Sequence, residues 1–409
     1  MYPISNPGQD TAYPQSAFSI PLLQWYQRSH RKLPWRETHD PYAILVSEVM
    51  LQQTQVKTVA PYYLRWMKKY PTVQALAAAS ETEALKSWEG LGYYRRARLL
   101  RAAARQIVSR HKGRFPDSIE TIEALPGVGP YTLGAVASIA FNLPMPVLDG
   151  NVIRVLCRWF GIRENTRQAI TRKKLWALAE TLIPKFRISK PGTLNFELGT
   201  SATPVAGDFN QAVMELGATL CVPHNPFCLL CPIREGCRAF THRMQHEIPS
   251  KIPHPPTIRQ FEYAGLVICN QRVLLYRRRS NQRMANLWQF PSVTLPDPSS
   301  RWPNLWKKTF GSLHKIASLS TSNYSVTNHR IRLEFFRIQG FRSLASRGES
   351  VNATSVAPGT RWVSLKAVRK LTLTAAHRKL ADRFLTTKKH KMHKILMTLC
   401  LLCLFVANL

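Results

Sequence analysis

The sequence predicts a mainly α N-terminal domain followed by an α+β C-terminal domain, as two periodicities and a change in composition indicate. From 17 to 240, apolar residues recur at spacings of three and four, beginning with Phe18 and Leu22, which is the period of a helix buried on one face. From 241 to 257 the chain is polar and contains four prolines, a composition typical of a semi-rigid linker. From 258 to 385, short alternating runs bounded by turn residues predict strands, so this domain is expected to be α+β.

Composition and charge narrow the class of partner. The chain of 409 residues has 57 Lys and Arg against 23 Asp and Glu, a formal net charge of +34, and 45% of its residues are hydrophobic. That apolar fraction is sufficient for real cores, which excludes a disordered basic protein. So large a positive charge predicts a polyanionic partner, with nucleic acid favoured over an anionic membrane surface.

The two ends of the sequence and its cysteine content suggest a location. Residues 1–16 contain neither a basic start nor an apolar core of a signal peptide, and eight cysteines are too few for a disulfide-stapled secreted chain. We therefore expect an intracellular, reducing environment. A basic and then apolar tail occupies 386–409; its uncharged part, 395–409, is shorter than the roughly 20 residues of a membrane span. No membrane partner is expected, although a tail anchor, an apolar segment packed on the second domain and a read-through sequence stay open.

A helix-hairpin-helix is predicted at residues 125–132, LPGVGPYT. Gly127 and Gly129 allow a sharp turn between two helical stretches and a close approach of another chain. The N–H groups at the start of the following helix can then hold a phosphate, which would grip DNA without reading its sequence. An ordinary corner between two helices is the alternative.

Two carboxylates lie in apolar surroundings. Glu48 lies within the helical run VSEVML, and Asp149 lies in VLDGNV, directly before the start of a helix. Taken singly, the first could be a half-exposed surface residue and the second an N-cap. Together they are what cleavage of a glycosidic bond needs, because one carboxyl group must stay protonated while the other, ionised, stabilises a sugar cation.

Four cysteines follow a helical run with the spacing C-x6-C-x2-C-x5-C; they are Cys221, Cys228, Cys231 and Cys237. Four thiolates in so short a loop can converge on one centre, and their softness favours iron-sulfur or zinc. Structural zinc sites more often pair two C-x2-C units across a longer gap. The compact run therefore favours a 4Fe-4S cluster, with zinc and unliganded thiols as the alternatives.

Taken jointly, these segments resemble the helix-hairpin-helix DNA glycosylase superfamily and, within it, the MutY-type adenine DNA glycosylases. The resemblance is carried by 47–56 (SEVMLQQTQV), 88–98 (WEGLGYYRRAR), the hairpin, 148–152 (LDGNV) and the four cysteines. It covers 17–240 closely and 258–385 loosely. It implies a glycosylase domain with one 4Fe-4S cluster in the loop 221–237, followed by a MutT/Nudix-like domain that recognises the mispair. The implied activity is base excision repair: a monomer flips adenine, mispaired with 8-oxoguanine or guanine, out of double-stranded DNA and hydrolyses its N-glycosidic bond, leaving an abasic site.

The resemblance also assigns roles in catalysis. Glu48 would be the general acid that protonates the purine at N7, and Asp149 would stabilise the sugar cation. Tyr131 would lie beside both, and Asn151 would orient the acid network. Bifunctional relatives that resemble endonuclease III carry a Schiff-base lysine where this chain has Tyr131, and a phenol cannot form an imine, so we expect a monofunctional hydrolase.

Further positions are expected to contact the DNA or the mispair. Gln53 and Tyr93 match residues that wedge into the space near the mispair. No MutT hydrolysis box occurs between 291 and 319, so the second domain is expected to recognise rather than hydrolyse. His329, in the segment Thr327-Asn328-His329, matches the histidine of a Phe-Ser-His segment that contacts the oxidised base; threonine replaces the aromatic residue, so polar hydrogen bonding must substitute for stacking.

The sequence also contains one segment that departs from the family pattern and one basic helical stretch. Residues 193–206 are interpreted as an inserted surface loop, and a helical stretch with Arg95, Arg96, Arg98 and Arg101 could face phosphate. The leading alternative function is an endonuclease III-like bifunctional glycosylase, and the other is a non-catalytic, redox-sensing DNA-binding protein. The expected location is intracellular and DNA-associated, in a bacterial cytoplasm or nucleoid. Neither the role of the cluster nor the degree of 8-oxoguanine discrimination follows from the sequence.

Overall fold

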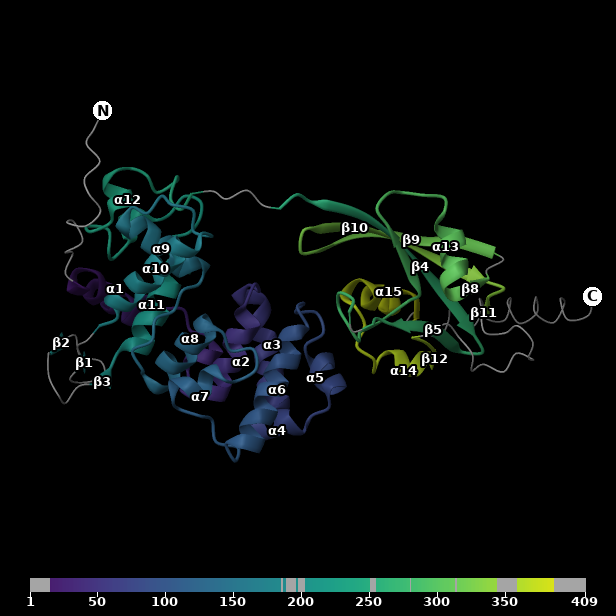
Figure 1. Cartoon of the computed structure of the whole chain (residues 1–409), viewed down its shortest axis with the longest axis horizontal. Coiled ribbons are helices and arrows are strands. Elements are labelled where there is room, and N and C mark those ends of the chain that lie inside the picture. The colour runs from purple at the N-terminus through teal and green to yellow at the C-terminus, as the bar shows by residue number, and fades with distance from the viewer. Residues whose placement is uncertain are drawn as a thin grey trace, which may run out of the picture. The chain divides into compact units, whose positions relative to one another are not determined.

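The computed structural model describes residues 15–184, 187–188, 196–197, 203–250, 255–279, 281–312, 315–343 and 359–385. The chain divides into two compact units, which are described separately: unit 1 combines 1–79 with 95–253, and unit 2 combines 80–94 with 254–409 (Figure 1). Unit 1 is helical and unit 2 is built on a sheet with helices, so the predicted fold class is confirmed.

Unit 1 is made almost wholly of helices. Its elements are α1 (Gln15–Ser29), η1 (Pro34–Arg36), α2 (Pro41–Leu51), α3 (Val56–Lys69), α4 (Val73–Ala78), α6 (Arg95–Arg110), α7 (Ile119–Glu123), α8 (Pro130–Phe141), α9 (Gly150–Phe160), α10 (Ala169–Leu182), β1 (Arg187–Ile188), β2 (Phe196–Glu197), β3 (Thr203–Pro204), α11 (Ala206–Thr219), η2 (Cys228–Leu230) and α12 (Arg238–Thr241). The three short strands pair in the order β2-β1-β3. β2 and β3 belong to the segment 193–206, which was expected to be an inserted loop; the rest of that segment before Val205 lies outside the described residues.

The core of unit 1 is formed around α2 and α8, which pack against each other. Every residue of α2 from Tyr42 to Met50 is buried, because the helix is apolar on all sides. Two close contacts within unit 1 depend on glycines. A Cβ on Gly134 of α8 would lie 1.9 Å from the Pro146 carbonyl oxygen, and one on Gly217 of α11 would lie 2.7 Å from the Cβ of Asn151. The loop before α9 can therefore approach α8, and α9 can approach α11, more closely than a side chain would permit.

Arg96 of α6 fixes the end of α2. It is 8% exposed, and its Nη1 donates to the carbonyl oxygens of Val49 (2.8 Å), Met50 (3.0 Å) and Gln52. Its Nη2 lies 3.3 Å from the Thr54 hydroxyl. The last carbonyl groups of a helix have no partner within the helix, and here a buried guanidinium supplies one. Arg96 thus caps a helix rather than facing phosphate, which corrects that expectation for this residue.

Replacing Arg96 with methionine is expected to lower the free energy of unfolding by about 3 kcal/mol, because buried carbonyl groups lose charge-assisted hydrogen bonds. The measurement is urea denaturation followed by circular dichroism. Arg105→Met, at an exposed position of the same helix, is the matched control and should change the stability by less than about 0.5 kcal/mol. Equal effects of the two substitutions would show that Arg96 does not cap α2.

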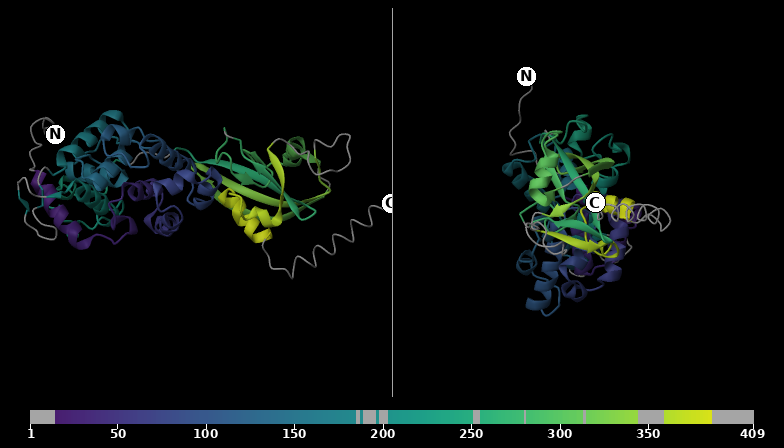
Figure 2. Two further views of the ribbon diagram at one scale, coloured as in Figure 1. Left: turned by 90° about the horizontal axis from the view of Figure 1, so that it is seen from below. Right: turned by 90° about the vertical axis from the view of Figure 1, so that its right-hand side faces the viewer.

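Unit 2 contains a twisted sheet with the strand order β12-β5-β4-β10-β9, in which β4 and β10 are parallel and the other pairs are antiparallel. Its elements are α5 (Glu81–Ser87), β4 (Ile258–Cys269), β5 (Arg272–Arg277), β6 (Trp288–Gln289), β7 (Ser292–Leu295), α13 (Trp302–Phe310), β8 (Gly311–Ser312), β9 (Lys315–Val326), β10 (His329–Gln339), β11 (Arg342–Ser343), β12 (Thr360–Ser364), α14 (Leu365–Val368) and α15 (Ala375–Leu385). One core lies between the sheet and α14 and α15, drawn in yellow in Figure 2, and a second core includes Trp306 of α13.

The strands form where alternation predicts them. Asn270 and Gln271, with φ of 45° and 56°, form the two-residue turn between β4 and β5. Positive φ at both residues gives the turn a twist that matches the twist of the two strands. In β10, Ile331, Leu333 and Phe335 are buried while Arg330 and Arg332 are exposed. No helix in the described ranges is both long enough and apolar enough to cross a membrane. The tail 386–409 lies outside the described residues.

Candidate active site

A cavity of about 550 Å³ opens between the helices of unit 1. Five residues that the sequence singles out line it: Glu48 from α2, Gln53 from the loop after α2, Tyr131 from α8, Asp149 from the N-cap of α9, and Asn151 from its first turn. Segments more than one hundred residues apart in the chain therefore meet around one space large enough for a flat, ring-shaped ligand.

Glu48 is a deeply buried acid of this cavity, with 4% of its surface exposed. The Tyr131 hydroxyl donates a hydrogen bond of 2.6 Å to its Oε2. Burial raises the pKa of Glu48 to about 7; the hydrogen bond from Tyr131 and the charge of Arg36 oppose this rise, and the charge of Asp149 adds to it. A large fraction of Glu48 is therefore protonated near neutral pH, which is the state that a general acid needs.

Asp149 lines the cavity and also caps α9. One oxygen accepts a hydrogen bond of 2.7 Å from the Val152 N–H, and the other accepts one of 3.0 Å from the Asn151 side chain. Burial raises the pKa of Asp149 above its usual value, while these hydrogen bonds and the nearby Arg154 lower it. Its donors stabilise the carboxylate form, so Glu48 and Asp149 are held in different environments. Both interpretations of Asp149, N-cap and cavity carboxylate, thus fit its place.

Tyr131 connects the acid to the opposite wall. Besides Glu48, its hydroxyl contacts the sulfur of Met214 at 3.3 Å. Burial, and then the charges of Glu48 and Asp149, raise the pKa of Tyr131 well above its usual value. The phenol therefore keeps its proton and acts as a donor to Glu48.

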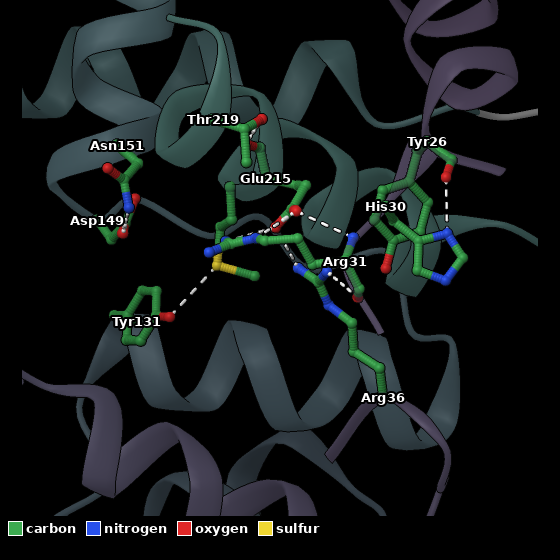
Figure 3. A network of polar contacts seen from close by, with 10 residues as sticks. Tyr26, His30, Arg31, Arg36, Tyr131, Asp149, Asn151, Glu215 and Thr219 are labelled. Carbon is green, nitrogen blue, oxygen red and sulfur yellow. Dashed lines mark hydrogen bonds and ion pairs between the residues drawn. The ribbon is translucent and has the colours of Figure 1, made fainter. Parts of the chain in front are cut away.

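The wall of the cavity contains an ion-pair cluster around a buried acid, and sequence reasoning missed this cluster. Glu215 of α11 is 1% exposed and accepts from Arg31 Nε (2.6 Å), Arg31 Nη2 (2.7 Å) and Arg36 Nη2 (2.8 Å). Burial alone would raise the pKa of Glu215, but the hydrogen bonds from the two arginines lower it to about 2. Figure 3 shows both guanidinium groups directed at Glu215, beside Tyr131 and Asp149. An acid inside the apolar helical run of α11 is the one signal that could have indicated this cluster.

A chain of hydrogen bonds leads from the cavity to the cysteine loop. Asn151, which donates to Asp149, accepts at its Oδ1 a hydrogen bond of 2.9 Å from Arg154 Nη2. The same guanidinium donates from Nε to the backbone carbonyl of Cys221 at 2.7 Å and from Nη2 to that of Gly217 at 2.7 Å. The orientation of Asn151, and through it of Asp149, therefore depends on where the cysteine loop lies.

The four predicted cysteines lie close enough to interact electrostatically. Burial raises the pKa of the Cys231 thiol to about 12, and the neighbouring Cys221, Cys237 and Cys228 add to this. Cys221 Sγ also accepts a hydrogen bond of 3.3 Å from the buried Arg158. Thiols so close together lose their protons only when a positive group lies among them, so the chemistry of this donor set fits a metal cluster. Within the described ranges, no group of three or more His, Cys, Asp or Glu side chains is arranged to hold a single metal ion.

The predicted hairpin lies between α7 and α8. Gly127 has φ of 83°, and a Cβ there would lie 2.8 Å from that of Leu99, so a glycine is required. Gly129 is the N-cap of α8, and a Cβ there would meet nothing within 4 Å, so another molecule can approach its backbone closely. The first N–H groups of a helix have no partner within the helix, so those of α8 can bind an anion.

Four of the five residues predicted to contact the DNA or the mispair do not line the cavity: Gly127, Gly129, Tyr93 and His329. Tyr93, with φ of 46° and 48% exposed, lies in the segment 80–94 that groups with unit 2. In that unit the carboxylate of Glu89 accepts hydrogen bonds from Arg378 (2.8 Å) and from the Leu373 N–H (3.1 Å). His329 begins β10 in unit 2 and is buried.

The cavity, with its two carboxylates, the helix-hairpin-helix and the cysteine loop together define a DNA glycosylase of the helix-hairpin-helix class. The chain matches the HhH-GPD superfamily of base excision DNA repair proteins over residues 46–181 and a NUDIX domain over residues 263–383. It is 37% identical to the adenine DNA glycosylase of Rattus norvegicus, over 89% of this chain and 77% of the relative. The corresponding Homo sapiens enzyme is 33% identical, over 89% and 73%. The chain belongs to the adenine DNA glycosylase family, which confirms the resemblance seen in the sequence.

Solved structures are similar to parts of the chain. A thermostable thymine-DNA glycosylase is 31% identical, with a TM-score of 0.47, over 56% of this chain and 97% of that one. An endonuclease III in a non-covalent complex with DNA is 22% identical, with a TM-score of 0.42, over 55% and 94%.

Proposed function

We propose that this protein hydrolyses the N-glycosidic bond of adenine mispaired with 8-oxoguanine or guanine, acting as a monofunctional glycosylase that leaves an abasic site. The observation that carries the proposal is the pairing, in one cavity, of a buried acid whose pKa is raised to about 7 with a second carboxylate held by hydrogen-bond donors. A glycosidic bond inside the duplex stack is out of reach, so the adenine must be flipped into this cavity.

The residues of the cavity have distinct tasks in the proposed reaction. Glu48 gives its proton to N7 of the flipped adenine, which turns the base into a neutral leaving group, and Tyr131 holds Glu48 in place. Asp149, ionised and steadied by Asn151, stabilises the positive charge that develops on the sugar. Water then adds to the sugar. The ion-pair cluster around Glu215 keeps the inner wall rigid, so that the flipped base meets fixed groups.

The acid-base assignment predicts the pH dependence of the reaction. Because Glu48 acts as an acid, the rate of adenine release should fall as the pH rises through about 7. Because Asp149 acts as an anion, the rate should also fall in acid, where that carboxylate becomes protonated. The check is the single-turnover rate measured from pH 5 to pH 9. A rate that stays constant through neutral pH would contradict the role of Glu48.

Separate groups of the protein are proposed to hold the cofactor and the DNA. We propose that Cys221, Cys228, Cys231 and Cys237 bind one 4Fe-4S cluster, which when bound cross-links the loop and thereby fixes the Arg154 contact. The backbone at Gly129 and the first turn of α8 would hold a phosphate. With a net charge of +34, binding to DNA should weaken steeply as salt is added. The proposed state is a DNA-associated monomer.

The activity can be tested with a duplex that contains one adenine opposite 8-oxoguanine. Strand breakage is compared with and without hot alkali. Breaks only after alkali are the expected result, since they show base removal without strand cleavage. Breaks before alkali would identify a bifunctional glycosylase of the endonuclease III type. Tight binding without any breaks would favour a redox-sensing DNA-binding protein.

A further inference from the structure

The histidine expected to touch the oxidised base is not open to it. His329 follows the turn between β9 and β10, where Thr327 has φ of 53°, and only 6% of its surface is exposed. Its Nδ1 lies 2.9 Å from Oε1 of Gln260, and its Nε2 contacts Nη2 of Arg283. An amide oxygen only accepts and a guanidinium only donates, so Nδ1 carries the proton and Nε2 accepts. Both ring nitrogens of this neutral imidazole are therefore occupied.

Arg283 is the exposed member of the contact. It lies in the turn between β5 and β6, and its guanidinium has five N–H donors, of which His329 uses one. No other partner of this guanidinium occurs in the described part of unit 2. Its backbone is fixed, because the Arg283 carbonyl accepts 2.6 Å from Arg278 Nε and the Asn286 N–H donates 2.9 Å to the Arg278 carbonyl. The turn thus presents fixed, unused hydrogen-bond donors at the surface.

The opposite face of the sheet offers a contrast. Arg330, the next residue along β10, is exposed and lies in register with the exposed Arg259 of β4. Side chains of consecutive strand residues point to opposite faces, so Arg330 and His329 point away from each other. Like charges side by side on a sheet repel, and a phosphate between them would relieve the repulsion. Arg330 is therefore placed to bind a DNA phosphate, whereas the guanidinium of Arg283 is held in position by His329.

We propose that Arg283, held by His329, is the residue with which unit 2 distinguishes 8-oxoguanine from guanine. The inference rests on the proposed function and names its specificity-determining residue. Oxidation gives guanine a carbonyl oxygen at C8, where guanine has only C–H. A guanidinium N–H can donate a hydrogen bond to this oxygen, whereas unmodified guanine has no acceptor at C8. His329 is a positioning residue that acts through Arg283.

The test measures binding by the full-length protein, so that it does not depend on catalysis. Dissociation constants are compared for two duplexes, with 8-oxoguanine or guanine opposite a non-cleavable abasic analogue. Arg283→Ala should reduce the preference for 8-oxoguanine by about tenfold, mainly through weaker binding of the oxidised duplex. The matched control Arg330→Ala should weaken both complexes equally and leave their ratio unchanged.

A second arm tests the role of His329. If it acts through Arg283, the double variant with His329→Ala and Arg283→Ala should show the same preference as Arg283→Ala alone. An unchanged preference in Arg283→Ala, an equal weakening of both duplexes, or a further loss in the double variant would each overturn the proposal. So would a wild-type protein without any preference, whatever its rate of adenine release.

Discussion

Replacing Glu48 with glutamine is expected to slow adenine release by at least about a thousandfold, because glutamine cannot give up a proton to the base. Glutamine has nearly the same shape and can still accept the hydrogen bond of 2.6 Å from Tyr131. Binding of the mispaired duplex should therefore stay within about twofold of wild type. The measurement is the single-turnover rate together with the dissociation constant, both at pH 7.

Stability provides an independent check on the same substitution. The pKa of Glu48 is raised in the folded protein, so folding holds its proton more tightly than the unfolded chain does, and stability is lost as the pH rises toward about 7. Glu48→Gln should remove this loss and unfold at a higher urea concentration than wild type at pH 8. Glu164→Gln, at an exposed ion pair with Lys174, is the control. Normal turnover in Glu48→Gln would exclude Glu48 as the acid.

Replacing Asp149 with asparagine should be nearly as damaging to the reaction, with a loss of about a thousandfold, because the developing sugar cation loses its counter-charge. Asparagine is as good an N-cap as aspartate, and its oxygen can still accept the hydrogen bond from the Val152 N–H. The free energy of unfolding should therefore change by less than about 1 kcal/mol. Single-turnover rates and urea denaturation measure the two effects.

The chain offers a matched control for this variant. Asp40 caps α2 by accepting a hydrogen bond of 3.0 Å from the Tyr42 N–H, and it does not line the cavity. Asp40→Asn should leave both the rate and the stability almost unchanged. If the two variants behaved alike, Asp149 would be no more than a cap.

Much of the site could be predicted because its residues lie in short local patterns. Glu48 interrupts an apolar helix and Asp149 precedes a helix start, and each pattern can be read within a few residues. The ion-pair cluster could not be found in this way, because Glu215 is separated from Arg31 by 184 positions. No local pattern records which distant charge an acid will meet, since only the packing of α11 against the rest of the core brings them together.

The fold shows the same limit. Alternation predicted the strands of unit 2, because the side chains of a strand must divide between core and solvent. The burial of His329 was not predicted, since its two partners come from another strand and from a separate turn. Arg96 was expected among residues facing phosphate for the same reason. The sequence shows the charge of an arginine, but it does not show which helix end that arginine will cap.

The close approach of α11 to α9 has a consequence for how variants of this protein are interpreted. At Gly217 the place of a side chain is taken by Asn151, whose Cβ would lie 2.7 Å from an added methyl group. A mutational scan that shortens side chains has nothing to remove at Gly217 and would therefore miss its importance. The informative change is an enlargement, because a single extra carbon would displace the residue that steadies Asp149. The loss of Gly217 should therefore be weighed as heavily as the loss of a carboxylate of the cavity.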